Sequence, residues 1–344
     1  MTSSCHPPSS LELSGVSPTV PPTGRRHEVR LPLPRTSTVR SSVRPVALVI
    51  AAVATASLAL SACSSPGADD NAPDATRTVD HARGATEVPA DPVRVITLEP
   101  VELDTSVALG VIPVGTTVLS EATGVPAYLG PEAEQIPTVG TVAEPRLEAI
   151  AALEPDLILG TDTRHGDFYD RLAAIAPTVF MASQSDPWQD NVRLVGRALG
   201  RESRAEEVLG EYTARCAEVA AAHDTAGRTA QLIRPRDDVL TLYGPLSFAG
   251  STLECAGFTT PPRPEWGDEI SVDLSPELVS QAEADLVLVT TVDPGADTPL
   301  PAPIVADPAV FPDPHPVDQS TWITGVGPKG GQAVLDDLER ILAR

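Results

Sequence analysis

A long stretch without proline constrains the fold of this chain more than any other feature. Residues 187–223 have helical periodicity and contain no proline after the first residue, although the 344-residue chain has 36 prolines. Glu202–His223 alone predicts a helix of about 33 Å, at a rise of ~1.5 Å per residue. Such a helix is longer than one small lobe requires. The sequence therefore predicts two lobes joined by one long helix.

Short apolar runs alternate with helical stretches on both sides of this helix. Residues 94–98 and 156–160 are strand-like runs in the first half, and the pattern starts again at Ala230. This alternation is typical of parallel α/β layers. We expect an N-terminal α/β lobe at residues 91–186, a linking helical segment at 187–223 and a C-terminal α/β lobe at 229–344.

An internal repeat supports two equivalent lobes. ALEPDLIL at residues 152–159 aligns with QAEADLVL at residues 281–288. Both read as the end of a helix, an acidic turn and a strand. Extending the register back without a gap places Glu148 opposite Glu277. A chance likeness of two helix–strand units is the alternative, and the long helix between the two copies favours the repeat.

The N-terminal region carries an export signal. Residues 46–60 are an uncharged apolar run of 15 that follows two arginines, whereas a membrane-spanning helix needs ~20 apolar residues. A basic flank, an apolar run and small residues at its end are typical of a secretory signal. The run ends in Leu-Ser-Ala-Cys63, which resembles a bacterial lipobox, in which the cysteine receives a diacylglyceryl group. Two acyl chains anchor a protein stably, so we expect the mature chain at the outer face of the cell membrane, held by the lipid on Cys63.

The boundaries of this region follow from its composition. We expect a leader at residues 1–44, a lipoprotein signal peptide at 45–62 and a disordered tether at 63–90, which starts with the polar stretch SSPGADDNAP. The pair Arg25-Arg26 lies about 20 residues before the apolar run, too far for a convincing twin-arginine signal. We also expect the true start codon to lie downstream of Met1.

Charge and motif content exclude several classes of function. The chain has 24 Lys+Arg against 47 Asp+Glu, and its first 62 residues hold six of the basic residues but only two of the acidic ones. A body this acidic disfavours nucleic acid and requires that contact with an anionic membrane be covalent. The sequence contains no CxxC, HExxH, Walker loop or GxSxG motif, which argues against an enzyme.

Short segments in a specific order and spacing carry a family resemblance. They are RVITL at 94–98, IPTVG at 136–140, EPRLEAI at 144–150, LEPDLI at 153–158, YGP at 243–245, SFAG at 247–250, AGF at 256–258, ADLVLVT at 284–290, WITGVGP at 322–328 and LDDL at 335–338. With these segments the chain resembles the ABC-importer substrate-binding proteins for ferric siderophores, cobalamin and haem. Its second half is more similar to the iron–siderophore branch.

The resemblance implies a fold and a set of partners. The fold is α/β, with two Rossmann-like lobes joined by one long α-helix, the class III periplasmic-binding-protein fold, and with modest hinge motion. The implied partners are a ferric siderophore bound between the lobes, an ABC permease and its ATPase. The siderophore carries its own Fe(III), so no cofactor and no protein metal ligands are expected, and we expect a monomer. The family pairs one acidic residue on each lobe with permease arginines, and the repeat assigns this role to Glu148 and Glu277.

Ligand contacts are expected where strands end, because side chains there face the binding crevice of an α/β lobe. Arg234 follows the first strand of the second lobe, where the family often has an arginine. Arg164, with His165, holds the matching place in the first lobe. Trp322, Tyr243 and Trp266 are further candidates, for which core packing is the alternative. Because the body is acidic, we expect a ferric hydroxamate or mixed ligand rather than a trianionic catecholate complex.

Several alternatives stay open at this stage. Cys216 and Cys255 are the thiols that remain once Cys63 is acylated, and an oxidising compartment permits a disulfide between them. Spacing alone does not show whether their Cα atoms come within ~7 Å. A cobalamin or haem carrier of the same fold, a lipoprotein that binds zinc or manganese directly, an extracellular hydrolase and a sensing adaptor are the alternative functions.

Overall fold

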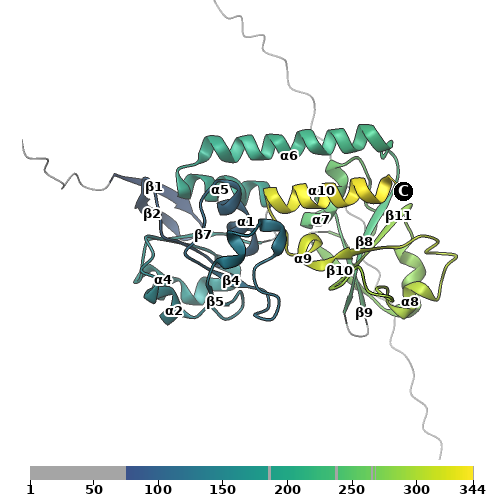
Figure 1. Ribbon diagram of the computed structural model, residues 1–344, viewed down its shortest axis with the longest axis horizontal. Coiled ribbons are helices and arrows are strands. Elements are labelled where there is room, and N and C mark those ends of the chain that lie inside the picture. The colour runs from purple at the N-terminus through teal and green to yellow at the C-terminus, as the bar shows by residue number, and fades with distance from the viewer. Residues whose placement is uncertain (1–74, 185–186, 237–238, 265, 268, 344) are drawn as a thin grey trace, which may run out of the picture. The chain divides into compact units, whose positions relative to one another are not determined.

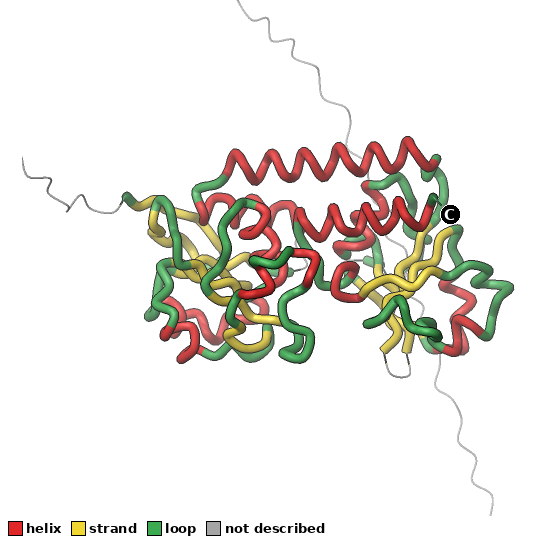
Figure 2. Tube along the Cα trace, viewed as in Figure 1, coloured by secondary structure: helices red, strands yellow, loops and turns green. Residues whose placement is uncertain are grey.

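The computed structural model describes residues 75–184, 187–236, 239–264, 266–267 and 269–343 (Figure 1). The predicted leader, the signal peptide and Cys63 therefore lie outside the described residues. The described chain contains two five-stranded sheets flanked by helices and a separate two-stranded sheet; Figure 2 colours strands yellow and helices red. Among the described residues, no helix has both the length and the apolar character needed to cross a membrane.

The N-terminal lobe is built on an all-parallel sheet of order β5-β4-β3-β6-β7. Its strands are β3 (Val95–Thr97), β4 (Gly115–Val118), β5 (Thr138–Thr141), β6 (Leu157–Thr161) and β7 (Thr178–Met181). Its helices are α1 (Pro100–Ala108), η1 (Ala127–Leu129), η2 (Ala133–Gln135), α2 (Leu147–Ala152), α3 (Asp162–His165), η3 (Gly166–Phe168) and α4 (Tyr169–Ala173). Every residue of β3, β4, β6 and β7 is buried, because crossover connections cover both faces of a parallel sheet.

The C-terminal lobe has a mixed sheet of order β10-β9-β8-β11-β12. Its strands are β8 (Ala230–Arg236), β9 (Val239–Tyr243), β10 (Ser271–Leu274), β11 (Leu286–Thr291) and β12 (His315–Asp318). Its helices are α7 (Phe248–Cys255), η4 (Pro276–Ala282), α8 (Ala302–Val305), α9 (Gln319–Trp322) and α10 (Pro328–Leu342). Strands β8, β11 and β12 are parallel, whereas β9 is antiparallel to both β8 and β10. The short connection from β8 to β9 forces that antiparallel pairing.

The linking segment consists of two helices, α5 (Trp188–Leu199) and α6 (Glu202–His223). Gly200 ends α5 in a left-handed conformation, at φ 66°, which glycine adopts without steric cost. The boundaries predicted for the long helix are confirmed. Its buried positions, Ala205, Val208, Leu209, Tyr212, Cys216 and Val219, recur every three or four residues and form one apolar stripe. Helix α10 runs alongside α6 (Figure 1).

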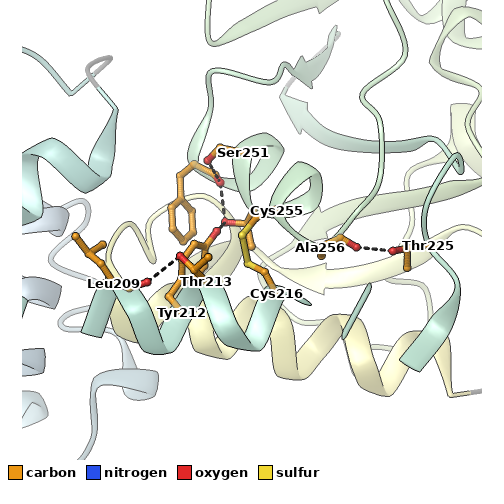
Figure 3. The surroundings of a disulfide bond; sticks show 10 residues. Leu209, Tyr212, Thr213, Cys216, Thr225, Ser251, Cys255 and Ala256 are labelled. Atoms are coloured by element: carbon orange, nitrogen blue, oxygen red, sulfur yellow. Dashed lines mark hydrogen bonds between the residues drawn. A yellow bond between two sulfur atoms is a disulfide. The ribbon is translucent and has the colours of Figure 1, made fainter. Parts of the chain in front are cut away.

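A disulfide joins α6 to the C-terminal lobe. Cys216 of α6 and Cys255 of α7 are bonded, with their Cα atoms 5.4 Å apart (Figure 3). The possibility left open by the sequence is thus confirmed, and the covalent bond fixes the long helix to the lobe that follows it in the chain.

The apolar core is continuous from one sheet to the other. One cluster of buried side chains contains Leu157 of the N-terminal sheet and Leu288 of the C-terminal sheet. Between them, Trp188 of α5 packs edge-to-face on Tyr212 of α6 and on Phe248 of α7, with ring centroids 5.0 and 5.6 Å apart. A wide opening of the lobes would expose these rings to water, which agrees with the modest hinge motion that the resemblance implies.

A buried carboxylate adds a polar contact between the lobes. Asp104 of α1 accepts the backbone N–H groups of Lys329 and Gly330, each at 2.8 Å, in the first turn of α10. These N–H groups have no partner within their own helix. Burial raises the pKa of Asp104 to about 7, while the bonds from Lys329, Gly330 and Tyr128 act in the opposite direction.

The prediction of a disordered tether at residues 63–90 is wrong for residues 76–89. Residues 76–89 form an antiparallel hairpin of β1 (Thr76–His81) and β2 (Gly84–Pro89). The hairpin docks on the edge of the N-terminal sheet, where the Nδ1 atom of His81 accepts the Phe180 N–H at 3.1 Å. Val79 and Val88, one in each strand, are buried, but the mostly polar composition of the segment hid both strands in the sequence.

The internal repeat is confirmed as a structural one. Asp156 and Asp285 precede β6 and β11, and each carboxylate accepts backbone N–H groups at the start of the neighbouring strand: Asp156 from residues 93 and 94 at 2.9 Å, and Asp285 from Thr229 at 2.7 Å. The next residues pair in the same way, Leu157 with Val95 and Leu286 with Ala230. Strands β3 and β6 thus correspond to β8 and β11.

Candidate ligand-binding site

Arg164 of the predicted site lies directly after the carboxyl end of β6. Its Nη1 atom is 3.3 Å from the Oε2 atom of Glu99, which follows β3. The Arg164 side chain is 38% exposed, whereas the Glu99 side chain is only 3% exposed. Burial raises the pKa of Glu99 to about 7, while Arg164 and the Thr161 hydroxyl act to lower it. A buried carboxyl group thus sits behind an arginine that reaches solvent.

His165, next to Arg164, has a structural role. It is fully buried; its Nδ1 atom accepts the Thr161 N–H at 3.1 Å, and its Nε2 atom lies 2.8 Å from the Val142 carbonyl oxygen. This arrangement requires the neutral tautomer with the proton on Nε2. Burial lowers the pKa of His165, which favours the same neutral form. The ring therefore holds the ends of β5 and β6 together and does not offer a free nitrogen to a ligand.

Arg234 lies near the carboxyl end of β8 and is half-buried. Its Nη1 atom is 3.5 Å from the hydroxyl oxygen of Tyr243 in β9. Its Nε atom is buried without a hydrogen-bond partner among the described residues. No ion pair of Arg234 occurs in that same part of the chain. Because the guanidinium is only half-buried and carries no ion pair there, its outer N–H groups are suited to an oxygen atom from outside the chain.

The pairing registers correct the expected equivalence of Arg164 and Arg234. Val95 and Ala230 hold equivalent places at the start of β3 and β8. Four residues further along, the counterpart of Arg234 is Glu99, not Arg164. The two lobes therefore carry a charged group at the same strand end, negative in the N-terminal lobe and positive in the C-terminal lobe.

The two candidate tryptophans belong to the core, so the prediction that they line the ligand site is wrong. Trp322 is 0% exposed, and its indole N–H donates to Asp337 of α10 at 3.1 Å. Trp266 is 7% exposed, and its indole N–H donates to the Pro261 carbonyl oxygen at 3.0 Å. Both rings bury a large apolar area and satisfy their one donor inside the protein, which explains the packing. Tyr243 is half-buried beside Arg234.

A cavity of about 530 Å³ lies where β4 and β5 end, and the sequence reasoning did not find it. Its lining consists of Leu119, Ser120, Glu121, Ala122, Gly140, Thr141, Glu144 and Arg146. Arg146 is 3.5 Å from Glu121, and both side chains are more than half exposed. Ligand pockets of proteins typically hold ~300–1,000 Å³, so the size fits a small molecule. The EPRLEAI segment contains Arg146 and was the signal available in the sequence.

Glu148 and Glu277 are exposed in the first turns of α2 and η4. These helices precede the equivalent strands β6 and β11. Neither glutamate has an ion-pair partner within the described ranges, so both carboxylates are accessible. In the part of the chain that the structure describes, no three or more His, Cys, Asp or Glu side chains gather in a group able to hold a metal ion.

Two α/β lobes joined by one long helix, with charged side chains at the carboxyl ends of the strands, define the class III periplasmic-binding-protein fold. The family model described as periplasmic binding protein matches residues 95–299. The chain belongs to this family, and to its siderophore- and cobalamin-binding type. The members are substrate-binding proteins, and the chain is not an enzyme.

Similar proteins include one that is named as siderophore-binding. The probable siderophore-binding lipoprotein YfiY of Bacillus subtilis is 30% identical over 303 residues, which cover 82% of this chain and 93% of that protein. The crystal structure of Staphylococcus aureus SirA complexed with staphyloferrin B has 28% identity and a TM-score of 0.66, and covers 78% of this chain and 99% of that one. The crystal structure of a periplasmic solute binding protein from Mycobacterium smegmatis has 27% identity and a TM-score of 0.68, and the match covers 79% of this chain and 99% of that one.

Proposed function

We propose that this protein is the membrane-anchored substrate-binding protein of an ABC importer, which captures a ferric siderophore outside the cell and delivers it for iron uptake. The single observation that carries the proposal is Arg234, a half-buried guanidinium at a strand end that has no ion-pair partner among the described residues. Ferric siderophores present oxygen atoms, and charge-assisted bonds from arginine to oxygen are among the strong hydrogen bonds. The names of YfiY and SirA support the same class of ligand.

The ligand we favour is a ferric hydroxamate or a mixed complex. Among the described arginines at the strand ends, Arg164 is paired with Glu99 and Arg146 with Glu121, which leaves Arg234 with the least compensated charge. The chain as a whole has a net charge of −23. A single arginine without an ion pair among these strand-end residues, in an acidic body, suits a ligand of low negative charge better than a trianionic catecholate complex.

A carboxylate-type ferric complex is the second candidate. The relatives include the Fe(3+) dicitrate-binding periplasmic protein FecB of Escherichia coli, 29% identical over 187 residues. An arginine and a carboxylate form two parallel hydrogen bonds in a favourable geometry. Cobalamin also stays in the test, because a cobalamin-binding protein of Halobacterium salinarum is 30% identical over 232 residues.

Quenching of tryptophan fluorescence tests the proposal. The soluble body is titrated with ferrioxamine, ferric citrate, ferric enterobactin, cobalamin and haem. We expect ferrioxamine or ferric citrate to bind best, and Arg234→Ala to weaken that binding by ~1.5–3 kcal/mol, roughly ten- to a hundredfold. Arg204→Ala is the control, since Arg204 lies on α6 among surface ion pairs. Tighter binding of enterobactin refutes the ligand class, and no binding of any ferric complex refutes the function.

Delivery and anchoring complete the proposal. The exposed Glu148 and Glu277 lie at equivalent places on the two lobes, which suits a permease that presents one basic site to each lobe. Two relatives are named as lipoproteins, which supports a lipid on Cys63 and a place at the outer face of the cell membrane. The Fe(III) arrives within the ligand, so we propose no resident cofactor.

A further inference from the structure

Glu99 is a carboxylic acid at the N-terminal strand ends that is almost completely buried. Its carboxylate is 3% exposed and touches Arg164, whose side chain is 38% exposed. The remaining N–H groups of the Arg164 guanidinium are therefore the part of this ion pair that an incoming ligand can reach. An arginine has five N–H donors, so it can hold a carboxylate behind it and an oxygen atom in front of it at once.

The charge balance of this pair depends on one proton. When Glu99 is ionised, it neutralises Arg164 across a water-poor contact, and the arginine attracts an anionic oxygen weakly. When Glu99 is protonated, the full positive charge of Arg164 is available to the ligand. An anionic oxygen on Arg164 in turn disfavours a second negative charge next to it, because like charges in one site raise the energy of the ionised form.

We propose that Glu99 is a proton-linked positioning residue of the ligand site: it orients Arg164, and it takes up a proton when a negatively charged oxygen of the cargo binds that arginine. The consequence is capture that is tighter at mildly acidic pH than at alkaline pH. This inference rests on the proposed function, because it requires a ligand with negatively charged oxygen atoms.

The groups around Glu99 permit this behaviour. Its pKa of about 7 places the titration within the range that an extracellular protein meets. Glu102, one turn along α1, is also buried; its Oε2 atom accepts the backbone N–H groups of Leu98 and Glu99 at 2.9 and 3.0 Å. Burial is the main cause that raises the pKa of Glu102, and the neighbouring Glu99 raises it further.

The other charged groups near Arg164 are already engaged. His165 is held in its neutral tautomer by Thr161 and Val142. Asp162, at the start of the same helix α3, is paired with Arg83 of the hairpin. Glu99 is therefore the group in contact with Arg164 whose protonation changes the charge that a ligand meets.

The test measures binding and proton uptake together. Ferrioxamine and ferric citrate are titrated into wild type and Glu99→Gln at pH 6.0, 7.0 and 8.5. Calorimetry in phosphate and in Tris, which differ in ionisation enthalpy, gives the number of protons taken up. For wild type we expect Kd to rise about tenfold from pH 6.0 to 8.5, and proton uptake near pH 7. For Glu99→Gln we expect a Kd that stays at the low-pH value of wild type, with no proton uptake.

The remaining variants separate the possible outcomes. Glu207→Gln removes an exposed carboxylate on α6 and should keep the pH dependence of wild type. Arg164→Gln changes a partly exposed side chain and keeps amide N–H donors in reach of Glu99, and circular dichroism checks its fold; we expect weaker binding at pH 6.0 and no proton uptake. Wild type and each variant are compared with the same iron complex at the same pH. The ratio of their Kd values therefore does not depend on how the complex itself changes with pH.

The outcomes also distinguish this inference from the proposed function. Binding with equal pH dependence in wild type, Glu99→Gln and Arg164→Gln overturns the role of Glu99 and leaves the proposed function intact. No binding of either complex at any pH overturns both. If Glu99→Gln does not fold, the Arg164→Gln result alone decides the question.

Discussion

Loss of the disulfide between Cys216 and Cys255 should destabilise the protein more than loss of any surface ion pair. The two residues are 39 apart in sequence, and closing a loop of that length removes chain entropy worth ~4 kcal/mol from the unfolded state. In the folded state the bond joins α6, where Cys216 is 1% exposed, to the end of α7 (Figure 3). The double variant Cys216→Ala/Cys255→Ala keeps these helices in place and removes the constraint.

Urea unfolding of the soluble body, followed by circular dichroism, measures this effect. Typical m-values are ~1–3 kcal/mol per M, so a loss of ~4 kcal/mol should lower the midpoint by more than about 1 M. Wild type with a reductant should unfold at the midpoint of the double variant, and the reductant should leave the variant unchanged. Equal midpoints for wild type and the double variant would show that the bond does not constrain the unfolded chain, and the estimate from loop entropy would be wrong.

Four further predictions concern a buried carboxylate, the pH dependence of stability, permease docking and the lipid anchor. Asp104→Asn places an amide donor against a backbone N–H of α10, so the free energy of unfolding should fall by ~1.5–3 kcal/mol. Urea unfolding measures this change, and Asp336→Asn, on the exposed side of α10, is the control variant. Because burial raises the pKa of Glu99 and of Asp104 to about 7, the folded state binds more protons than the unfolded state between about pH 4 and 7. The contribution of these two groups to the free energy of unfolding is therefore largest below about pH 4 and is lost as the pH rises through about 7. A urea midpoint that rises from pH 5 to 8 would contradict this pH dependence. Glu148→Arg/Glu277→Arg should block iron uptake by cells but keep the Kd for the ligand, because like charges at an interface cost several kcal/mol, and normal uptake would end the docking hypothesis. Cys63→Ala should move the protein from the membrane fraction to the soluble fraction, and full retention in the membrane would refute the lipid anchor.

The charge asymmetry between the lobes shows where sequence reasoning failed at the site. A strand end was recognised for Arg234 but not for Glu99, although the two hold equivalent places. The strand β3 is short, and Glu99 is the residue immediately before helix α1, so no local pattern marks it as a strand-end residue. Only the pairing of β3 with β6 reveals that its side chain is buried behind Arg164.

Aromatic residues were misjudged for a related reason. A tryptophan near a glycine-rich segment fits a ligand site as well as a core, and sequence spacing does not separate the two. In the structure the indole of Trp322 is enclosed and donates to Asp337. The indole N–H of Trp322 finds this acceptor because α9 packs against α10 in the folded chain.

The sequence by itself determined the two lobes, the long helix with its ends, and the internal repeat. These features depend on local patterns: periodicity along α6, alternation of strands and helices, and an acidic residue before each of two equivalent strands. Tertiary structure alone decided that Cys216 meets Cys255, that Asp104 bonds to α10, and that Glu99 lies behind Arg164. Each of these contacts joins residues that are far apart in the chain, so it follows from the packing of whole elements rather than from any local pattern.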